Sequence, residues 1–207
     1  MPDQTSQEPL VLAFDTSVAH CAAALLSGDR VLVSRVEPMT KGQAERILAL
    51  CEELLEEAGV TYGNLTALGV GIGPGNFTGI RIAVSAARGL ALGLGIPAVG
   101  VDAFDALREG HDGPCACAVD ARRDQVFLQG FDNPAIAEPA LYDANDLPAF
   151  DGPLIGAGGQ LSALPVAEAI ARIAAKRFAA NPARPAPLYL RPADAAPARD
   201  VAPVLLP

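Results

Sequence analysis

A block of glycines lies between an apolar stretch at 67–72 and a long run of small and apolar residues at 78–94, and its sequence is Gly73-Pro74-Gly75-Asn76-Phe77-Thr78-Gly79. The first stretch has the length of a buried strand, and the second has the length and composition of a helix. The sequence therefore predicts a strand, a tight structural turn and a helix. We expect Thr78 to cap that helix and Gly79 to permit close packing in its first turn.

Glycines at such a position can also bring backbone N–H groups to an anion at a helix start. The spacing matches neither of the two familiar nucleotide loops. A dinucleotide fingerprint needs a third glycine where Asn76 stands, and a P-loop needs a Gly-Lys-Ser/Thr sequence that does not follow. Both interpretations stay open, with a structural turn favoured over anion binding.

The periodicity of the first half predicts three strands, a helix, a strand, a helix and a strand. Strands are expected at 10–14, 20–26, 31–36, 67–72 and 98–101, and helices at 43–58 and 78–94. This order is the ribonuclease H-like arrangement that the actin-like ATPase (ASKHA) superfamily uses twice. The fold class expected is therefore α/β.

A second, shorter cycle begins at Cys115. An apolar stretch at 115–119 ends in Asp120-Ala121-Arg122 and is followed by another at 125–131, which repeats the pattern at the start of the chain. A strand at 154–156, a helix at 166–179 and a proline-rich end complete it. We expect two ribonuclease H-like lobes, 1–104 and 105–207, the second abbreviated.

Charge and cysteine usage narrow the classes of function. The formal net charge of -9 argues against a protein that binds nucleic acid by itself, so any tRNA contact should be indirect, through a partner. Four scattered cysteines and two isolated histidines do not form a zinc pattern, and we expect reduced, mostly buried thiols and no metal site. Without a secretory signal or an expected membrane-spanning helix, the protein should be cytoplasmic and make no membrane contact.

Two carboxylates follow the first strands of the two cycles. Asp15, with Thr16 beside it, and Asp120 stand where kinases of this fold hold magnesium and phosphate. The alternative is that both carboxylates satisfy local turns. Local turns are favoured, because the chain supplies no base, phosphate-binding lysine or ligand cluster around them.

The helix at 78–94 is apolar or small around nearly its whole circumference. One side must meet the sheet, and the other needs cover from the helix at 43–58 or from a second protein. If part of it stays uncovered, a partner is expected there. The residues predicted to bind that partner are Leu48, Cys51, Leu55, Arg81, Val84, Ser85, Arg88 and Leu92.

Six segments occur in the order seen in TsaB proteins, and on them the chain resembles the TsaB family. They are Asp15-Thr16-Ser17, Glu45-Arg46-Ile47-Leu48, the block from Gly73 to Arg81, Gly89-Leu90-Ala91, Val119-Asp120-Ala121-Arg122 and Pro187-Leu188-Tyr189-Leu190-Arg191. The resemblance implies a non-catalytic subunit that pairs with the transferase TsaD through the two first-lobe helices, with the ATPase TsaE joining the pair. Alone, the same patch could form a weak homodimer.

The chain departs from the family pattern at several points. Gln43 stands where many TsaB sequences have histidine, Asn76 replaces the usual serine, and the second lobe is shorter than in many relatives. Where TsaD has a metal-binding His-x-x-x-His, this chain offers Gln43 and Ile47, which are not useful ligands. No catalytic residue and no cofactor are therefore expected.

Two enzymatic alternatives compete with the scaffold. The first is a small-molecule phosphotransferase or ATPase that uses Asp15 and Asp120 around magnesium and ATP. The second is a metallopeptidase of the glycoprotease type, which conflicts with the missing ligands.

Overall fold

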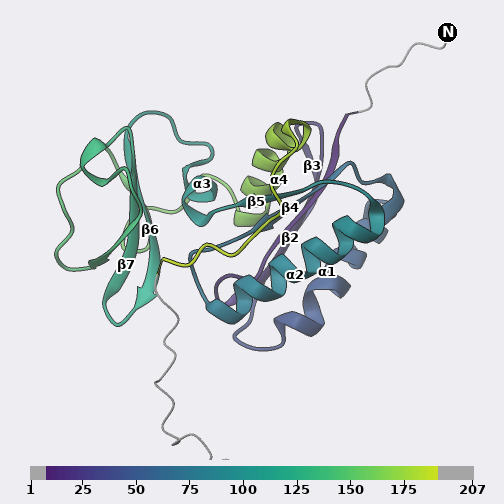
Figure 1. Ribbon diagram of the computed structural model, residues 1–207, viewed down its shortest axis with the longest axis horizontal. Helices are drawn as coiled ribbons and strands as arrows, with labels where there is room; N and C mark the ends of the chain where they lie inside the picture. The colour runs from purple at the N-terminus through teal and green to yellow at the C-terminus, as the bar shows by residue number, and fades with distance from the viewer. Residues whose placement is uncertain (1–7, 191–207) are drawn as a thin grey trace, which may run out of the picture.

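The computed structural model of the protein describes residues 8–190, which form two lobes side by side (Figure 1). The first lobe holds a sheet of order β3-β2-β1-β4-β5, in which β1, β2 and β3 are antiparallel while β4 and β5 run parallel to β1. Its strands are β1 (Leu10–Asp15), β2 (His20–Ser27), β3 (Arg30–Pro38), β4 (Ala67–Gly71) and β5 (Ala98–Val101). Every element predicted from 10 to 101 is present, and the short helix η1 (Tyr62–Asn64) is added.

Helices α1 (Gln43–Glu57) and α2 (Phe77–Leu94) cover one face of this sheet (Figure 1). Because side chains alternate along a strand, Leu12 and Phe14 of β1 point to that face. They are fully buried there with Leu50 of α1 and Ile80 of α2. This cluster is the largest apolar core that the described part of the chain contains.

Helix α4 (Val166–Arg177) covers the opposite face of the same sheet. Its Ile170 and Ala174 pack on Val11 and Ala13 of β1. These two side chains point to the face of the sheet opposite to the one that α1 and α2 cover. Gly69 of β4 lets the helix approach, because a Cβ there would lie 3.0 Å from both Ile170 and Ala174. The prediction that this helix belongs to the second lobe is wrong, since the chain crosses back after β9 to cover the first sheet.

The second lobe is built on a sheet of order β8-β7-β6-β9. Its strands are β6 (Cys115–Arg122), β7 (Gln125–Phe131), β8 (Ala140–Asp143) and β9 (Leu154–Gly156), with the short helix η2 (Pro134–Ile136) after β7. Three antiparallel strands and a fourth parallel to β6 reproduce the β3-β2-β1-β4 part of the first sheet. The internal repeat predicted from the sequence is therefore present, in abbreviated form.

The boundary predicted between residues 104 and 105 falls inside a helix that the sequence did not reveal, α3 (Ala103–Arg108). Asp102 caps it by accepting a 2.8 Å hydrogen bond from the N–H of Asp105, and Phe104 is buried on the second sheet. Asp105 also pairs with Arg177 at the end of α4, at 2.8 Å. Helix α3 therefore links the two lobes.

After η3 (Phe178–Ala180), the chain returns in extended form between the lobes (Figure 1). The N–H of Leu188 donates a 2.8 Å hydrogen bond to the carbonyl of Ile72, and Leu190 packs on the second lobe's core. The segment at 181–190 therefore contacts both lobes. Arg191, the last residue of the motif noted above, lies outside the described residues.

By length and composition alone, α2 would also suit a membrane span, with a mean hydropathy of 1.3 over 18 residues and two arginines. This is weak evidence for a membrane span, because the core helix of a soluble protein meets the same criterion, and the expectation of no membrane-spanning helix stays a prediction. Five residues of α2 are buried against its own lobe, namely Gly79, Ile80, Ala83, Val84 and Ala87. The apolar character of the helix serves the packing of this lobe on one side.

Candidate functional site

The glycine turn between β4 and α2 is attached to the residues that follow β1. Thr16 Oγ1 donates a 2.7 Å hydrogen bond to the carbonyl of Gly79, and the N–H of Asn76 donates one of 2.6 Å to the carbonyl of Ser17. A Cβ on Gly75 would collide with the Ser17 carbonyl, and one on Gly79 would collide with the Thr16 carbonyl. Close backbone packing by itself therefore explains these glycines, which supports the structural interpretation of the turn.

The cap of α2 is Asn76, whose side chain accepts a 3.0 Å hydrogen bond from the N–H of Gly79. Thr78 is exposed in the first turn, so the prediction that it caps the helix is wrong. The helix begins at Phe77, one residue earlier than expected, which moves the capping position to the asparagine.

The carboxylate of Asp15 is buried and occupied by neighbours. Its Oδ2 accepts hydrogen bonds from the N–H and hydroxyl of Ser17, at 3.0 and 2.9 Å, and lies 2.6 Å from Nε2 of His20. Asp120 is exposed and accepts a 3.0 Å bond from the N–H of Arg122. Both carboxylates thus satisfy local turns, as the favoured interpretation predicted.

A groove of about 930 Å³ separates the lobes, and Asp120 and Ser17 line it while Asp15 does not. The strand ends and turns of both lobes meet there, and Leu188, Tyr189 and Leu190 form another wall. Within residues 8–190 no group of three or more His, Cys, Asp or Glu side chains could hold a metal ion.

The partner-binding residues predicted on α1 and α2 divide into two sets. Cys51, Leu55 and Val84 are at most 3% exposed and belong to the first lobe's core. Their prediction as surface contacts is wrong, because the two helices pack closely enough to bury them between each other and the sheet. The residues that do face outward are Leu48, Arg81, Ser85, Arg88 and Leu92.

Residues 8–190 leave the outer side of α2 uncovered. Leu92 is 81% exposed, and Leu48 of α1 is 41% exposed. Ser85, Gly89 and Gly93 recur every four residues and therefore share one helix face. A Cβ built on Gly89 or Gly93 would meet none of residues 8–190 within 4 Å, so packing within the described part of the chain does not require either glycine.

An aromatic stack at the start of α2 adds residues that sequence reasoning did not place at this surface. The rings of Phe77 and Tyr189 stack with centroids 4.9 Å apart, and the Arg81 guanidinium lies 3.7 Å from the Phe77 centroid. Nε of Arg81 also donates a 2.7 Å hydrogen bond to the Tyr189 hydroxyl. This contact could not be predicted from local sequence patterns, because Tyr189 is 108 positions after Arg81.

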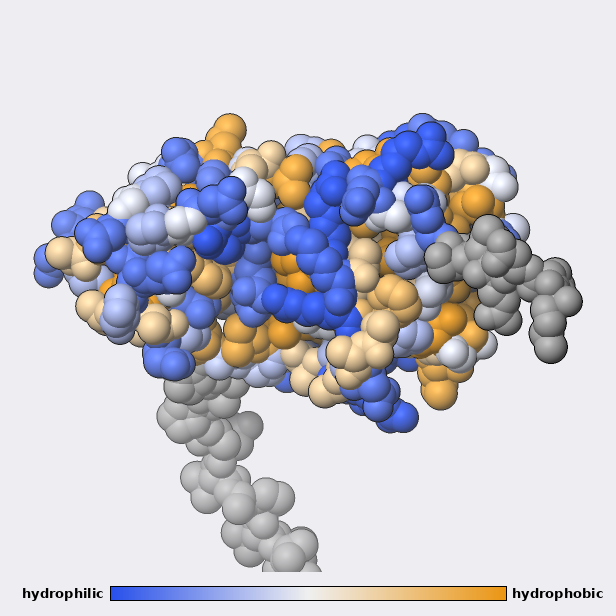
Figure 2. Space-filling view, turned by 90° about the horizontal axis from the view of Figure 1, so that it is seen from above, coloured by the Kyte–Doolittle hydropathy of each residue, from blue (hydrophilic) through white to orange (hydrophobic). Residues whose placement is uncertain are grey.

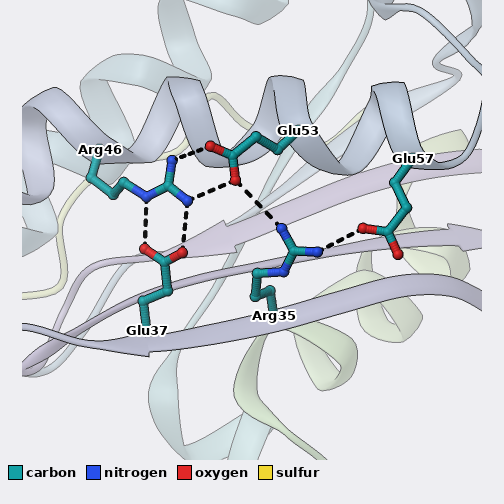
Figure 3. Close-up of polar contacts among 5 residues, drawn as sticks. All are labelled: Arg35, Glu37, Arg46, Glu53 and Glu57. Atoms are coloured by element: carbon teal, nitrogen blue, oxygen red, sulfur yellow. Dashed lines mark hydrogen bonds and ion pairs between the residues drawn. The ribbon is translucent and has the colours of Figure 1, made fainter.

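A charge network fixes α1 to the edge strand β3 (Figure 3). Arg46 donates hydrogen bonds to both carboxylate oxygens of Glu37, at 2.6 and 2.7 Å, and also to Glu53. Glu53 forms a second ion pair with Arg35, and Arg35 also pairs with Glu57. The hydrogen bonds from Arg46 hold the pKa of the Glu37 carboxyl below its usual range. Glu53 and Glu57 are therefore occupied within the chain.

Comparisons with known proteins agree with this architecture. A family model described as "TsaD: tRNA N6-adenosine threonylcarbamoyltransferase" matches residues 37–147. The structure titled "YeaZ from Pseudomonas aeruginosa" is similar with a TM-score of 0.73 and 28% identity, over 88% of this chain and all of that one. TsaB of Escherichia coli (strain K12), "tRNA threonylcarbamoyladenosine biosynthesis protein TsaB", is 34% identical over 122 residues, 56% of this chain and 52% of that protein.

The chain belongs to the TsaB family. YeaZ is a synonym of TsaB, so sequence and structure lead to the same family and confirm the resemblance seen in the motifs. The predicted fold class of two ribonuclease H-like lobes in the actin-like ATPase superfamily is confirmed as well. The match to E. coli TsaB covers about half of that protein. An uncharacterized protein of Mycobacterium tuberculosis (strain ATCC 25618 / H37Rv) matches over nearly its full length: it is 34% identical over 90% of this chain and 94% of its own.

Proposed function

We propose that this TsaB-family chain is a non-catalytic subunit of the assembly that makes tRNA threonylcarbamoyladenosine, and that it binds and stabilises TsaD. The TsaB relatives of Escherichia coli and Haemophilus influenzae are named for that biosynthesis. The observation that carries the proposal is the uncovered face of α2, where Leu92 is 81% exposed beside two glycines with open space above them.

Helix α4 provides an internal comparison, because it covers the other face of the same sheet. Its outer side carries Glu168, Arg172 and Lys176. Seen from above, a band of hydrophilic residues crosses the middle of the molecule, with hydrophobic residues beside it (Figure 2). A helix with a polar outer side needs no further cover. The outer side of α2 instead combines Arg81 and Arg88 with small residues and Leu92, and the small residues suit the close approach of another helix.

Each interior glycine costs a helix about 1 kcal/mol relative to alanine. Gly89 and Gly93 bring this cost to α2 without any packing benefit from the residues that the structure describes, because those residues leave the space above both glycines open. A partner helix seated on Ser85, Gly89 and Gly93 would supply that benefit. We infer that the stripe is shaped for intermolecular contact.

TsaD is the partner that the comparisons favour. The family model for TsaD matches a range of this chain that includes both α1 and α2, so TsaD should possess equivalent helices. Two such pairs can form a four-helix interface, with TsaE joining the assembled pair. In the absence of TsaD, two copies of this chain could pair weakly about a two-fold axis through the same face.

An accessory role also agrees with the state of the two carboxylates. Asp15 is turned into its own loop, which leaves Asp120 as the one member of the pair on the groove. A phosphotransferase or ATPase would need tight binding of magnesium-ATP and turnover by the isolated chain. Calorimetry and phosphate release with the isolated chain should show neither, and either result would favour the enzyme.

The interface is tested by mixing the purified chain with TsaD from the same genome and measuring mass by light scattering. The wild-type chain should form a one-to-one complex, and Leu48→Glu with Leu92→Glu should abolish it. Leu161→Glu is the matched control, because Leu161 is 91% exposed outside α1 and α2. A complex that survives the double substitution would remove α1 and α2 as the docking face.

Contact with tRNA should be made by the complex. The net charge of -9 gives this chain few cations with which to release counterions from phosphates. Filter binding should detect no tRNA retained by the isolated chain at 150 mM salt, a condition chosen to be about physiological. With this proposed role in tRNA modification, we expect the protein to be cytoplasmic.

A further inference from the structure

A hollow of about 440 Å³ opens on the outer side of α2, and its chemistry is basic. Its walls are Arg81, Ser85 and Arg88 from the helix and Pro187 from the returning C-terminal segment, while Val84 contributes an apolar side. Arg81 and Arg88 are seven residues apart and therefore share a helix face. The hollow adjoins the Ser85, Gly89 and Gly93 stripe.

Arg81 is held in place before any partner arrives. Its guanidinium lies over the Phe77 ring, and its Nε donates to the hydroxyl of Tyr189 at 2.7 Å. An arginine has five N–H donors, so this contact leaves the terminal nitrogens available. Because the side chain is already ordered, binding an acceptor costs it little further conformational entropy.

Arg88 makes no hydrogen bond or ion pair with any residue from 8 to 190. It is exposed, and α2 contains no Asp or Glu that could pair with it. By contrast, Arg35 and Arg46 both bind glutamates of α1. The chain contains 24 acidic residues, yet this face of α2 presents only positive charge.

We propose that the hollow between Arg81 and Arg88 receives a carboxylate side chain from the TsaD helix that packs on α2. This inference rests on the proposed docking of TsaD at the same face and adds the chemistry that TsaD must present there. A guanidinium binds a carboxylate through two parallel hydrogen bonds, which fixes orientation as well as charge. The Ser85 hydroxyl can donate a further bond from the same wall.

A protein carboxylate fits the surroundings better than a phosphate of tRNA. The hollow continues into a surface of small residues and Leu92, which suits an apolar helix, and α2 itself carries no cation besides Arg81 and Arg88 for a nucleic-acid backbone. Once a helix covers this surface, the charge pair is shielded from water. The attraction between the two charges is then stronger, because the surrounding dielectric constant is lower.

The same charges would discriminate TsaD from a second copy of this chain. If two copies met with α2 on α2, four arginines would approach one another without a carboxylate from either helix. Juxtaposed like charges disfavour a complex. A TsaD helix that carries a carboxylate at this point would displace the self-pair.

The test measures the Kd of the chain for TsaD by calorimetry at 50 and 300 mM sodium chloride. Arg88→Glu should raise the Kd about 10- to 100-fold at the lower salt, and Arg88→Lys, which keeps the charge, should raise it about threefold or less. Arg30→Glu, a charge reversal at the exposed first residue of β3, is the matched control and should leave the Kd unchanged. Salt should weaken the wild type more than Arg88→Ala.

The outcomes separate this inference from the docking proposal. If Leu92→Glu abolishes binding while Arg88→Glu changes the Kd less than about twofold, the carboxylate inference is wrong and the docking face stands. If both variants bind TsaD like the wild type, the docking face itself is wrong. If Arg88→Glu leaves TsaD binding intact but weakens tRNA binding by the assembled complex, the occupant is a phosphate and the inference is overturned.

Discussion

Thr16 Oγ1 donates a 2.7 Å hydrogen bond to the carbonyl of Gly79 and thereby joins the end of β1 to the first turn of α2. The two residues are 63 positions apart and the bond is buried. Because Gly79 has no side chain, its backbone can lie directly against the Thr16 carbonyl. This contact sets where α2 begins, and so helps to direct the outer face of the helix away from the sheet.

Gly79 and Gly89 lie on the same helix and should respond oppositely to alanine. In Gly79→Ala the new Cβ would collide with the Thr16 carbonyl, and we expect a loss of about 2 kcal/mol or more in the free energy of unfolding. In Gly89→Ala the new Cβ enters open space, so helix propensity should add about 0.5–1 kcal/mol. Urea unfolding of both variants checks this, and a destabilised Gly89→Ala would contradict it.

The four cysteines should be inert in the native protein. All four are free and buried, and burial raises the pKa of the Cys21 thiol to about 11 and those of Cys51 and Cys117 well above their usual range. A thiol that is both protonated and enclosed reacts slowly with disulfide reagents. Ellman's reagent at pH 8 should therefore titrate no fast thiol before urea is added and all four afterwards. A fast native thiol would show that one of these packing sites opens.

The cap of α3 gives a pH-dependent prediction. Burial raises the pKa of Asp102, so between its ordinary and its raised pKa the folded chain binds more protons than the unfolded chain. The free energy of unfolding therefore falls as pH rises through this range, and the cost is fully present above it. Asp102→Asn keeps a good cap without the buried charge and should gain on the order of 1 kcal/mol at pH 7.5.

The gain from Asp102→Asn should shrink as pH falls below the ordinary aspartate range, because the wild-type carboxyl is then neutral too. Asp112→Asn is the control, since Asp112 is exposed on the loop before β6 and should change stability little at either pH. Denaturant titrations at pH 7.5 and 3.5 measure both variants. A gain that grows as pH falls would contradict the assigned cause.

Local patterns in the sequence predicted the elements of this fold well. The short apolar run at 10–14 and the helical stripe at 43–58 predicted the positions of β1 and α1, and the Asp120-Ala121-Arg122 segment predicted the repeat that the second sheet confirms. These features depend on residues that are close together in the sequence, and the periodicity of apolar residues can be read directly from such short segments.

Long-range packing could not be predicted in the same way. An apolar stripe on α4 does not say which sheet it covers, and the crossing back to the first lobe places it on β1 and β4. The spacing of apolar residues also shows where the centre of a helix's buried face lies, but it does not show where the buried face ends and the exposed face begins. Leu55 and Val84 were therefore predicted at the surface although the contact between α1 and α2 buries them. The approach of Tyr189 to Arg81 spans 108 positions and has no local signal.

The uncovered face of α2 is best tested through a thiol placed near the C-terminal end of the helix. With the native cysteines buried, Leu92→Cys should be the fast-reacting thiol of the variant, and Leu161→Cys provides the matched exposed control. Saturating TsaD should slow maleimide labelling of Leu92→Cys at least about tenfold, because a thiol covered by the partner reacts only while the complex is dissociated. Labelling of Leu161→Cys should change less than about twofold. An unchanged labelling rate at Leu92→Cys, in a sample where TsaD co-elutes with the chain, would show that the partner binds elsewhere.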